Sequence, residues 1–233
     1  MSQRLWQLLA CGLLALLVLP AAAEPGNALV FGGTGRLGAP IVRLLVAAGH
    51  PVTVFARPDS DRRRLAGLEL DYVTGDLTEV QSVLAAVGGR RFSFVIDASA
   101  RRGNPNPFYG QAMKYILAAI ADSQVRQFIL HGSVGAGENR QQFPGVFERM
   151  EAVMQAKGEA EDLLRASGIT YTIIRNGIVQ RDGTAATGTA RLSKNQSLLG
   201  RVTRLDLARL TMECLDNEAC ANQTFHAVDD SLN

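Results

Sequence analysis

The sequence predicts an α/β fold with a single, doubly wound parallel sheet and helices on both of its faces. Short apolar runs alternate with longer stretches of helical periodicity, which is typical of βαβ units that feed a parallel sheet. A glycine-rich turn follows the first apolar run directly. The 233 residues are enough for one sizeable core, and neither an internal repeat nor a second domain boundary is evident.

The strands are predicted from buried apolar runs, and the helices from apolar residues three and four positions apart. The first helix has this spacing at Leu37, Ile41, Leu44, Leu45 and Ala48 and ends at Gly49. In chain order, strands are expected at 28–31, 52–56, 70–73, 94–97, 128–131, 171–175 and 224–228. Helices are expected at 37–48, 79–87, 108–121, 147–166 and 206–215, with a short arginine-rich helix after the second strand and loops at 104–107 and 183–189.

Residues 1–23 are predicted to be a secretory signal peptide, and residues 24–233 the folded domain. The segment has a basic start, an uncharged apolar stretch from Leu8 to Leu19, and small residues at its end. This stretch has the length of a signal peptide's apolar region and is shorter than a membrane span. We therefore expect a periplasmic or secreted protein that is cleaved after Ala23. The alternative is an uncleaved membrane anchor formed by residues 5–23.

The overall charge gives no reason to expect a nucleic-acid partner. Lys and Arg number 24 against 22 Asp and Glu, which leaves a net charge of +2 and no global field for a polyanion. Aromatic residues make up only 6% of the chain, which argues against a stacking platform for single strands. Membrane contact is expected only if the N-terminal segment is retained. A small-molecule acceptor or protein partner must be sought in local sites, and no metal is predicted.

The clearest functional motif is the turn Gly-Gly-Thr-Gly-Arg-Leu-Gly, which joins the first strand to the first helix. In a Rossmann-like fold, Gly32 permits the tight turn, Gly35 lets the backbone approach a pyrophosphate, and Gly38 lets the helix pack on the strand. Free N–H groups at the helix start attract the anion. The predicted dinucleotide-binding residues of this turn are Gly32, Thr34, Gly35, Arg36, Leu37 and Gly38. The alternative is a turn with a purely structural role.

The end of the second strand selects the form of the dinucleotide. An acidic residue there would bind the ribose hydroxyl of NAD, whereas this strand ends in Arg57, which suits the 2′-phosphate of NADP. We therefore predict NADP(H), with Arg36 as a second cation on the same side. The alternative is NAD(H), with Arg57 an exposed loop residue paired to Asp59 or Asp61. The run Arg62–Arg64 is interpreted as a solvated helix face.

Asp76 and Leu77 follow the third strand and are predicted to belong to the cofactor site. Thr78 and Gln81 have the spacing of a capping box for the next helix, which leaves the Asp76 carboxylate for the adenine amino group. The alternative is that Asp76 itself caps that helix.

The glycine turn, Arg57, the segment Gly75–Leu77 and the stretch Ala156–Arg175 together resemble an atypical short-chain dehydrogenase/reductase of the NAD(P)H-binding, NmrA-like group. The resemblance covers nearly all of the chain after residue 23. It implies a Rossmann sheet, with the pyrophosphate at the glycine turn and the adenine at Asp76.

The same resemblance implies that Ala98 and Ser99 lie along the cofactor and that Lys157 meets the nicotinamide ribose. Catalytic members of the family carry a Tyr four residues before this Lys, so that both side chains project from one helix face and the phenol transfers a proton. Here that position is Val153, which cannot transfer a proton. In addition, Asn176 stands where the family commonly has a proline.

The catalytic candidates are therefore Lys157 and Ser133. Ser133 follows the fifth strand at the place of the family's serine and either orients a carbonyl oxygen or is a turn residue. His131 is interpreted as a satisfied residue at the strand end rather than a general acid. Spacing does not place the tyrosines at 109, 115 and 171.

Three functional classes fit these residues. The first is an NADPH-dependent reductase that passes hydride to a quinone-, flavin- or enone-type acceptor, with the proton taken from water. The second is a non-catalytic NADP-binding redox sensor, scaffold or assembly factor. The third, a methyltransferase that uses S-adenosylmethionine, is disfavoured because Arg57 stands where that fold needs an acid. Export conflicts with all three, because nicotinamide cofactors are expected to be scarce outside the cytoplasm.

After residue 23 the chain keeps two cysteines, Cys214 and Cys220, an even count that suits an oxidising compartment. They flank the expected end of a helix, where a reversing chain can bring their Cα atoms to the ~5.5 Å that a disulfide needs. We predict that they are bonded, and the alternative is two separate buried thiols.

Overall fold

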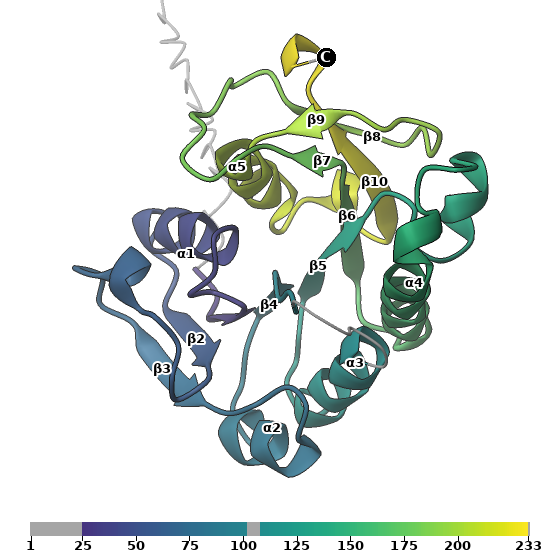
Figure 1. The fold of residues 1–233 in the computed structure, drawn as a ribbon. Helices are drawn as coiled ribbons and strands as arrows, with labels where there is room; N and C mark the ends of the chain where they lie inside the picture. Colours follow the sequence, from purple (N-terminus) through teal and green to yellow (C-terminus); the bar gives the residue numbers. More distant parts are fainter. Residues whose placement is uncertain (1–24, 102–107, 233) are drawn as a thin grey trace, which may run out of the picture.

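The computed structural model describes residues 25–101 and 108–232, so the predicted signal peptide and the loop at 104–107 lie outside the described residues (Figure 1). Its main sheet has the strand order β3-β2-β1-β4-β5-β6-β10-β8, with β8 antiparallel to β10 and the other neighbours parallel. These strands are β1 Ala28–Phe31, β2 Val52–Ala56, β3 Asp71–Thr74, β4 Phe94–Asp97, β5 Gln127–Ser133, β6 Tyr171–Asn176, β8 Arg191–Ser193 and β10 Gln223–Val228. A separate pair consists of β7 Ile178–Val179 and β9 Arg201–Val202. The predicted doubly wound parallel sheet is confirmed.

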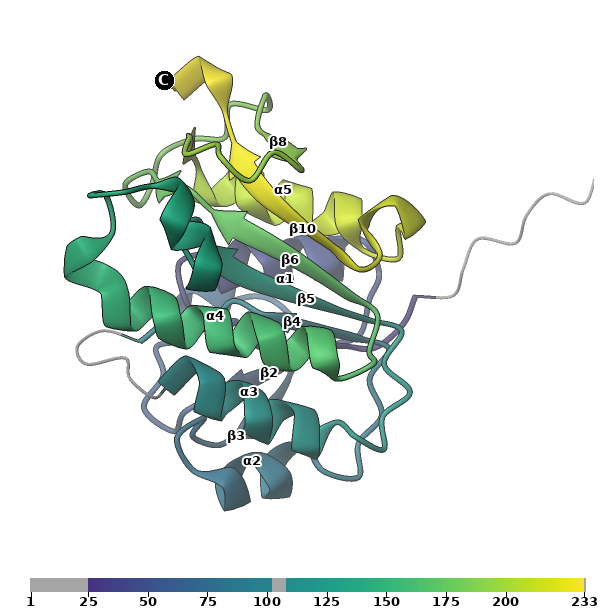
Figure 2. The same cartoon turned by 90° about the vertical axis from the view of Figure 1, so that its right-hand side faces the viewer.

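Helices cover both faces of the sheet (Figure 2). The helices are α1 Gly38–Ala47, α2 Val80–Val87, α3 Phe108–Ala119, α4 Glu151–Ala166 and α5 Arg204–Cys214. Side chains of a strand alternate between the two faces, and β1 shows the result. Val30 packs in the core with Ile41 of α1 and Leu207 of α5, whereas Leu29 packs in the core with α2, α3 and α4. None of the helices within the described ranges has the length and apolarity needed to cross a membrane.

The sheet reverses its winding direction between β1 and β4. From β1 the chain moves outward through β2 and β3, and it then returns to build β4, β5 and β6 on the other side of β1. Phe31 at the end of β1 is in register with Asp97 at the end of β4. In open α/β sheets, ligands bind at the carboxyl ends of the strands at such a reversal.

Two of the predicted helices differ in detail from the structure. In α1, Leu44 and Ala48 were expected on the buried face, but Leu44 is 38% exposed, and Val42 is buried instead. The reason is that Leu44 and Ala48 line an open groove between α1 and α5 and do not face the sheet. The helix expected at 147–166 begins at Glu151, after a separate 3₁₀ turn at Glu148–Met150.

The fifth strand is longer than the apolar run predicts. It extends to Ser133, because the register with β6 continues through Gly132 with Arg175 and Ser133 with Asn176. Ser133 is therefore the last residue of a strand and not a turn residue. The short strands β7, β8 and β9 were not predicted, because no apolar run in the sequence marks them.

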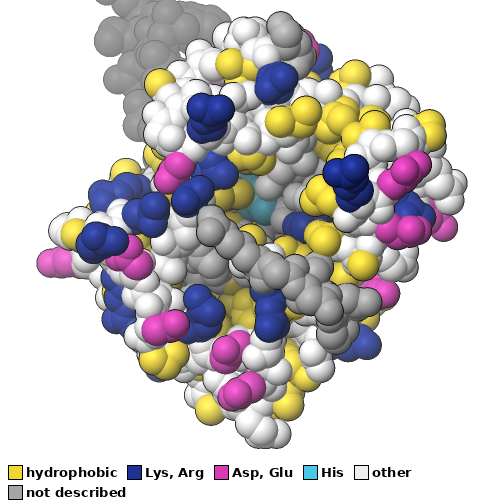
Figure 3. Space-filling model, viewed as in Figure 1, with side chains coloured by type: hydrophobic (Ala, Val, Ile, Leu, Met, Phe, Trp, Pro, Cys, Tyr) yellow, Lys and Arg dark blue, Asp and Glu magenta, His cyan; other side chains and the backbone are white. Residues whose placement is uncertain are grey.

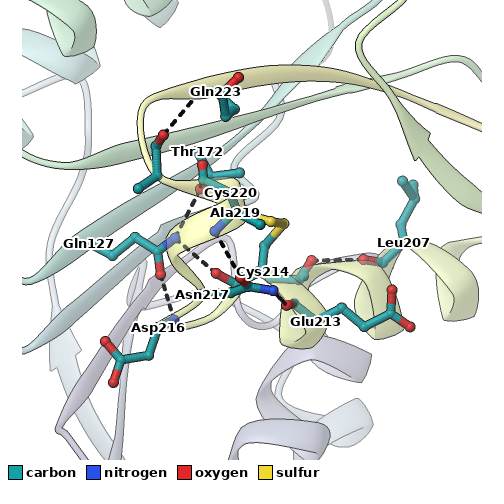
Figure 4. The surroundings of a disulfide bond; sticks show 12 residues. Gln127, Thr172, Leu207, Glu213, Cys214, Asp216, Asn217, Ala219, Cys220 and Gln223 are labelled. Atoms are coloured by element: carbon teal, nitrogen blue, oxygen red, sulfur yellow. Dashed lines mark hydrogen bonds between the residues drawn. A yellow bond between two sulfur atoms is a disulfide. The ribbon is translucent and has the colours of Figure 1, made fainter.

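The predicted disulfide is present between Cys214 and Cys220, whose Cα atoms are 5.4 Å apart (Figure 4). It joins the end of α5 to the 3₁₀ turn Glu218–Cys220 that follows. The buried Gln127 amide donates to the Cys214 carbonyl at 2.9 Å, and the Thr172 hydroxyl donates to the Cys220 carbonyl at 2.8 Å. These two hydrogen bonds hold the bridged segment at the amino-terminal ends of β5 and β6.

Removal of this disulfide is expected to lower the free energy of unfolding by about 2 kcal/mol, because the bond closes a short loop in the unfolded chain. Urea unfolding of the Cys214→Ala/Cys220→Ala double variant, compared with the oxidised wild type, measures the change. The wild type with dithiothreitol should behave like the variant. Free thiols mapped to both positions in the denatured, non-reduced protein would contradict the bond.

Candidate cofactor site

The predicted glycine turn joins β1 to α1 at the carboxyl edge of the sheet, and two of its positions accept only glycine without rearrangement. Gly32 has a φ of 71°, and a Cβ placed there would lie 2.6 Å from the Ala98 carbonyl oxygen. A Cβ at Gly38 would lie 2.2 Å from the Gly32 carbonyl oxygen. Both clashes are with backbone atoms, so a side chain at either position would force the turn open.

The start of α1 presents backbone N–H groups to this edge. The first N–H groups of a helix have no partner within the helix, and Leu37 at the N-cap offers no side-chain acceptor. Thr34 and Gly35 are half-buried in the turn, and Arg36 is exposed at its rim. The Gly35 and Ala39 N–H groups donate to the Gly32 and Gly35 carbonyls. A narrow glycine cradle at a helix start, with an adjacent cation, fits the pyrophosphate of a dinucleotide.

The segment after β4 lies against the glycine turn. The Ala98 N–H donates to the Phe31 carbonyl at 3.0 Å, and the Ser99 N–H donates to the Asp97 carboxylate at 2.8 Å. The structure thus brings Ala98 and Ser99 beside the turn, as the predicted cofactor path requires. Their contact with a cofactor stays a prediction.

Arginines gather near the glycine turn and the end of β2, and Figure 3 shows Lys and Arg side chains around a hollow on the face seen in Figure 1. Arg57 is exposed, and its Nε lies 3.7 Å from Asp59. Arg36 and Arg64 both pair with Asp182, each at 3.4 Å. Arg62, Arg63 and Arg64 are all exposed, as expected of a solvated helix face. Within it, Arg62 lies over the Tyr72 ring and Arg63 pairs with Asp61.

The capping box predicted at Thr78 and Gln81 does not form. Instead, the Asp76 carboxylate accepts hydrogen bonds from the Thr78 N–H and hydroxyl, both at 2.8 Å, and Glu79 is the N-cap of α2. The box is out of register, because α2 has Glu79 and not Thr78 at its N-cap. The bonds from Thr78, with the field of nearby arginines, lower the pKa of Asp76. Leu77 is buried in the core, so its side chain faces away from solvent.

Lys157 reaches from α4 into a small cavity of about 10 Å³, room for about one water molecule. Asp97, Tyr109 and His131 line the same cavity, and the Lys157 Nζ lies 4.4 Å from the centre of the Tyr109 ring. Burial lowers the pKa of Lys157, and the carboxylate of Asp97 opposes that shift. Burial likewise raises the pKa of Asp97. Ser99 also lines the cavity and lies against Gly32, so the lysine cavity and the glycine turn flank the same segment after β4.

A buried ion pair fixes the helix that carries this lysine. Glu161, one helical turn after Lys157, is fully buried and accepts from the Arg175 guanidinium of β6 at 2.6 Å. Arg165 donates to the same carboxylate at 2.9 Å. The ion pair of Glu161 with Arg175 thus joins α4 to β6 one helical turn after Lys157.

His131 is a satisfied strand-end residue, as predicted. Its Nδ1 lies 3.2 Å from the side chain of Asn176, and its Nε2 lies 2.9 Å from the Thr211 hydroxyl. Burial lowers its pKa to about 4, so the ring is neutral at pH 7 and is no general acid. The departure at Asn176 has a structural reason, since proline there could offer His131 no amide.

The tyrosines, unplaced by the sequence, now have positions. Tyr109 lies beside Lys157, and burial raises the pKa of its phenol, which therefore keeps its proton at neutral pH. Tyr171 begins β6 at the opposite edge of the sheet, and the Tyr115 hydroxyl accepts from Gln111. Val153 lies one helical turn before Lys157 on α4.

Sequence reasoning missed Asp97, Tyr109 and Asp182. Asp97 carried a signal, because a charged residue ends an otherwise apolar strand run at the carboxyl edge. Tyr109 and Asp182 carried none, because helix α3 and the loop after β7 contact the site only through tertiary packing.

A reversal of the sheet, a glycine cradle at its carboxyl edge and flanking arginines define a Rossmann protein that binds a nicotinamide dinucleotide. The model of the NAD(P)H-binding family matches residues 32–218, and the chain therefore belongs to this family, within the atypical short-chain dehydrogenase/reductase group. The resemblance inferred from the sequence is confirmed.

Characterised relatives differ in what they do. The chain is 23% identical to an NAD(P)H azoreductase of Xenophilus azovorans, over 84% of this chain and 66% of that protein. It is 26% identical to the photosystem II assembly factor Ycf39 of Cyanophora paradoxa, over 86% of this chain and 62% of that protein. It thus spans less than two thirds of either relative. The structure of ChuY, an anaerobillin reductase from Escherichia coli O157:H7, superposes with a TM-score of 0.73 at 26% identity, over 89% of this chain and 98% of that one.

Proposed function

We propose that the protein is an NADPH-dependent reductase of electron-poor acceptors of the quinone, flavin or enone type. The observation that carries the proposal is the cavity at the carboxyl ends of β4 and β5, which Lys157 lines with Asp97 and Tyr109. NADPH, when bound, supplies a hydride. Lys157 would hold the nicotinamide ribose, and Ser133 at the end of β5 would orient the acceptor.

The residues around Lys157 favour acceptors that need no proton from the protein. Val153 cannot transfer a proton, His131 is neutral at pH 7, and burial raises the pKa of Tyr109. General acid–base groups typically contribute about 10²–10⁴-fold to such reactions. Reduction of simple ketones and oxidation of alcohols should therefore be negligible, whereas a quinone or flavin can take its proton from water.

An assay with a panel of acceptors tests the proposal. NADPH consumption is measured with a quinone, flavin mononucleotide, an enone and an azo dye, and NADP⁺ reduction with secondary alcohols. We expect at least one electron-poor acceptor to oxidise NADPH. We expect no reduction of NADP⁺ with any of the alcohols. Robust secondary-alcohol dehydrogenase activity would overturn the proposal.

A second candidate is a non-catalytic NADP-binding redox sensor, scaffold or assembly factor. It is favoured by Val153 in place of the family's tyrosine, and by the similarity to a relative named as an assembly factor. This candidate predicts binding of NADPH without oxidation by any acceptor in the panel.

We also propose that NADP(H) is preferred over NAD(H), and that Arg57→Ala removes most of the preference. The exposed guanidinium of Arg57 at the end of β2 suits the 2′-phosphate, and such a charge-assisted contact contributes roughly 1.5–3 kcal/mol, or about 10- to 100-fold in affinity. Calorimetric titration with both cofactors measures the ratio. Arg191→Ala, another exposed arginine in an ion pair, is the matched control and should leave the ratio unchanged. Equal affinities in the wild type would defeat the assignment.

Export remains our proposal for the location of the protein. The disulfide between Cys214 and Cys220 supports it, because such bonds persist in oxidising compartments. Amino-terminal sequencing of the protein from its native host should begin at Glu24. A cytosolic protein that retains Met1 would refute export.

A further inference from the structure

Asp182 lies between two arginines of the proposed 2′-phosphate region. Its Oδ2 is 3.4 Å from the Arg36 Nε and 3.4 Å from an Arg64 amino group. Arg36 belongs to the glycine turn, and Arg64 to the 3₁₀ turn Arg63–Leu65 that follows β2. All three side chains are between two-fifths and one-half exposed, so the carboxylate and both guanidinium groups are open to solvent.

Asp182 belongs to a loop that is anchored at both ends and not at its tip. Before it, the Gln180 N–H donates to the Val202 carbonyl at 2.9 Å. After it, the N–H groups of Thr187 and Gly188 donate to the buried carboxylate of Asp206 at 2.9 and 3.0 Å.

Between these anchors, the polar contacts of the tip with the rest of the described chain are the hydrogen bond from Arg64 to Asp182 and the ion pair of Asp182 with Arg36. The other bonds of residues 181–184 are internal, from Thr184 to the Arg181 carbonyl. A Cβ added to Gly183 would meet nothing within 4 Å. The tip is therefore held in place by the Asp182 ion pairs rather than by packing.

We propose that Asp182 is an internal competitor for the 2′-phosphate of NADP(H), with its carboxylate on the guanidinium groups that the phosphate engages when the cofactor binds. The inference rests on the proposed NADP preference and adds Asp182 and Arg64 to the residues that set it. Carboxylate and phosphate accept the same hydrogen bonds from guanidinium groups. Because exposed ion pairs are weak, a phosphate with more charge and more acceptor oxygens displaces Asp182 and frees the tip at 181–184.

The competition affects the choice between NADP(H) and NAD(H). NAD(H) has no 2′-phosphate and leaves the Asp182 ion pairs intact, so it gains nothing from their removal. Asp182 therefore weakens the binding of NADP(H) selectively, and its loss should widen the preference for NADP(H) over NAD(H).

Calorimetric titration of the wild type and Asp182→Asn with NADPH and NADH tests this inference. We expect Asp182→Asn to bind NADPH about threefold to tenfold more tightly, in line with the loss of two exposed ion pairs, and to bind NADH as the wild type does. Adenosine 2′,5′-bisphosphate should show the same gain, and adenosine 5′-monophosphate none. Asp216→Asn is the matched control, because Asp216 pairs with Arg126 at the amino-terminal edge of the sheet and has a φ of 56° that Asn accepts.

The outcomes separate this inference from the proposed function. A wild type that binds NADPH no more tightly than NADH overturns the proposed NADP preference. Failure of the inference appears in the variant: unchanged or weaker NADPH binding would mean that Asp182 positions the arginines rather than competing with the phosphate. An equal gain for NADPH and NADH would show a general charge effect and would also overturn it.

Discussion

Replacement of Lys157 by Ala is expected to lower the rate of NADPH oxidation about 100-fold in the active protein. The lysine is the cation of the cavity at the end of β4 and β5, where it lies over the Tyr109 ring and in the field of Asp97. Loss of a group that positions a reactant can cost about 100-fold, because a small displacement takes the reacting atoms out of line. Steady-state NADPH consumption with the best acceptor of the panel measures the effect.

Lys157→Met separates charge from packing. It keeps an unbranched side chain of similar length but removes the ammonium group. If Lys157 acts through its charge, Met and Ala should lower the rate to a similar extent. A Lys157→Met variant with wild-type turnover would show that the lysine only fills space, and would remove it from the catalytic candidates.

Glu161→Gln is expected to lower the free energy of unfolding by about 3–5 kcal/mol, because it leaves the guanidinium of Arg175 buried without its counter-ion. Glu161 is fully buried and accepts at 2.6 Å from Arg175, whose side chain is 9% exposed. Urea unfolding followed by circular dichroism measures the loss.

The neighbouring residue supplies a matched control for this prediction. Asp162 pairs with Arg165 at 2.8 Å but is 78% exposed, and exposed pairs contribute about 0–1 kcal/mol. Asp162→Asn should therefore change stability by less than about 1 kcal/mol. Equal losses in Glu161→Gln and Asp162→Asn would contradict a special role for the buried pair.

The sequence predicts the order of the sheet elements and the glycine turn because both depend on local patterns. The run Ala28–Phe31 and the turn after it are contiguous, and apolar periodicity announces the helices that follow. The disulfide was also predictable from the sequence, because its two cysteines flank one helix end. Elements whose bounds depend on neighbouring strands were harder to predict, as the extension of β5 to Ser133 shows.

The site was predictable on the side of the glycine turn and less so around the lysine. Asp97 and Tyr109 reach Lys157 from β4 and α3, and only packing of those elements with α4 brings the three together. Asp182 reaches Arg36 across a long sequence separation in the same way. The capping box failed because α2 begins one residue later than the box requires, with Glu79 rather than Thr78 at its N-cap.

Native mass spectrometry in a mixture of cofactors tests the central claim, that this fold binds NADP(H), most directly. The purified wild type is incubated with equal concentrations of NADPH, NADH and S-adenosylmethionine, and the mass of the complex identifies the ligand that is retained. The arginines beside the glycine turn predict that the complex carries NADPH. A complex that carries NADH or S-adenosylmethionine instead would contradict the account.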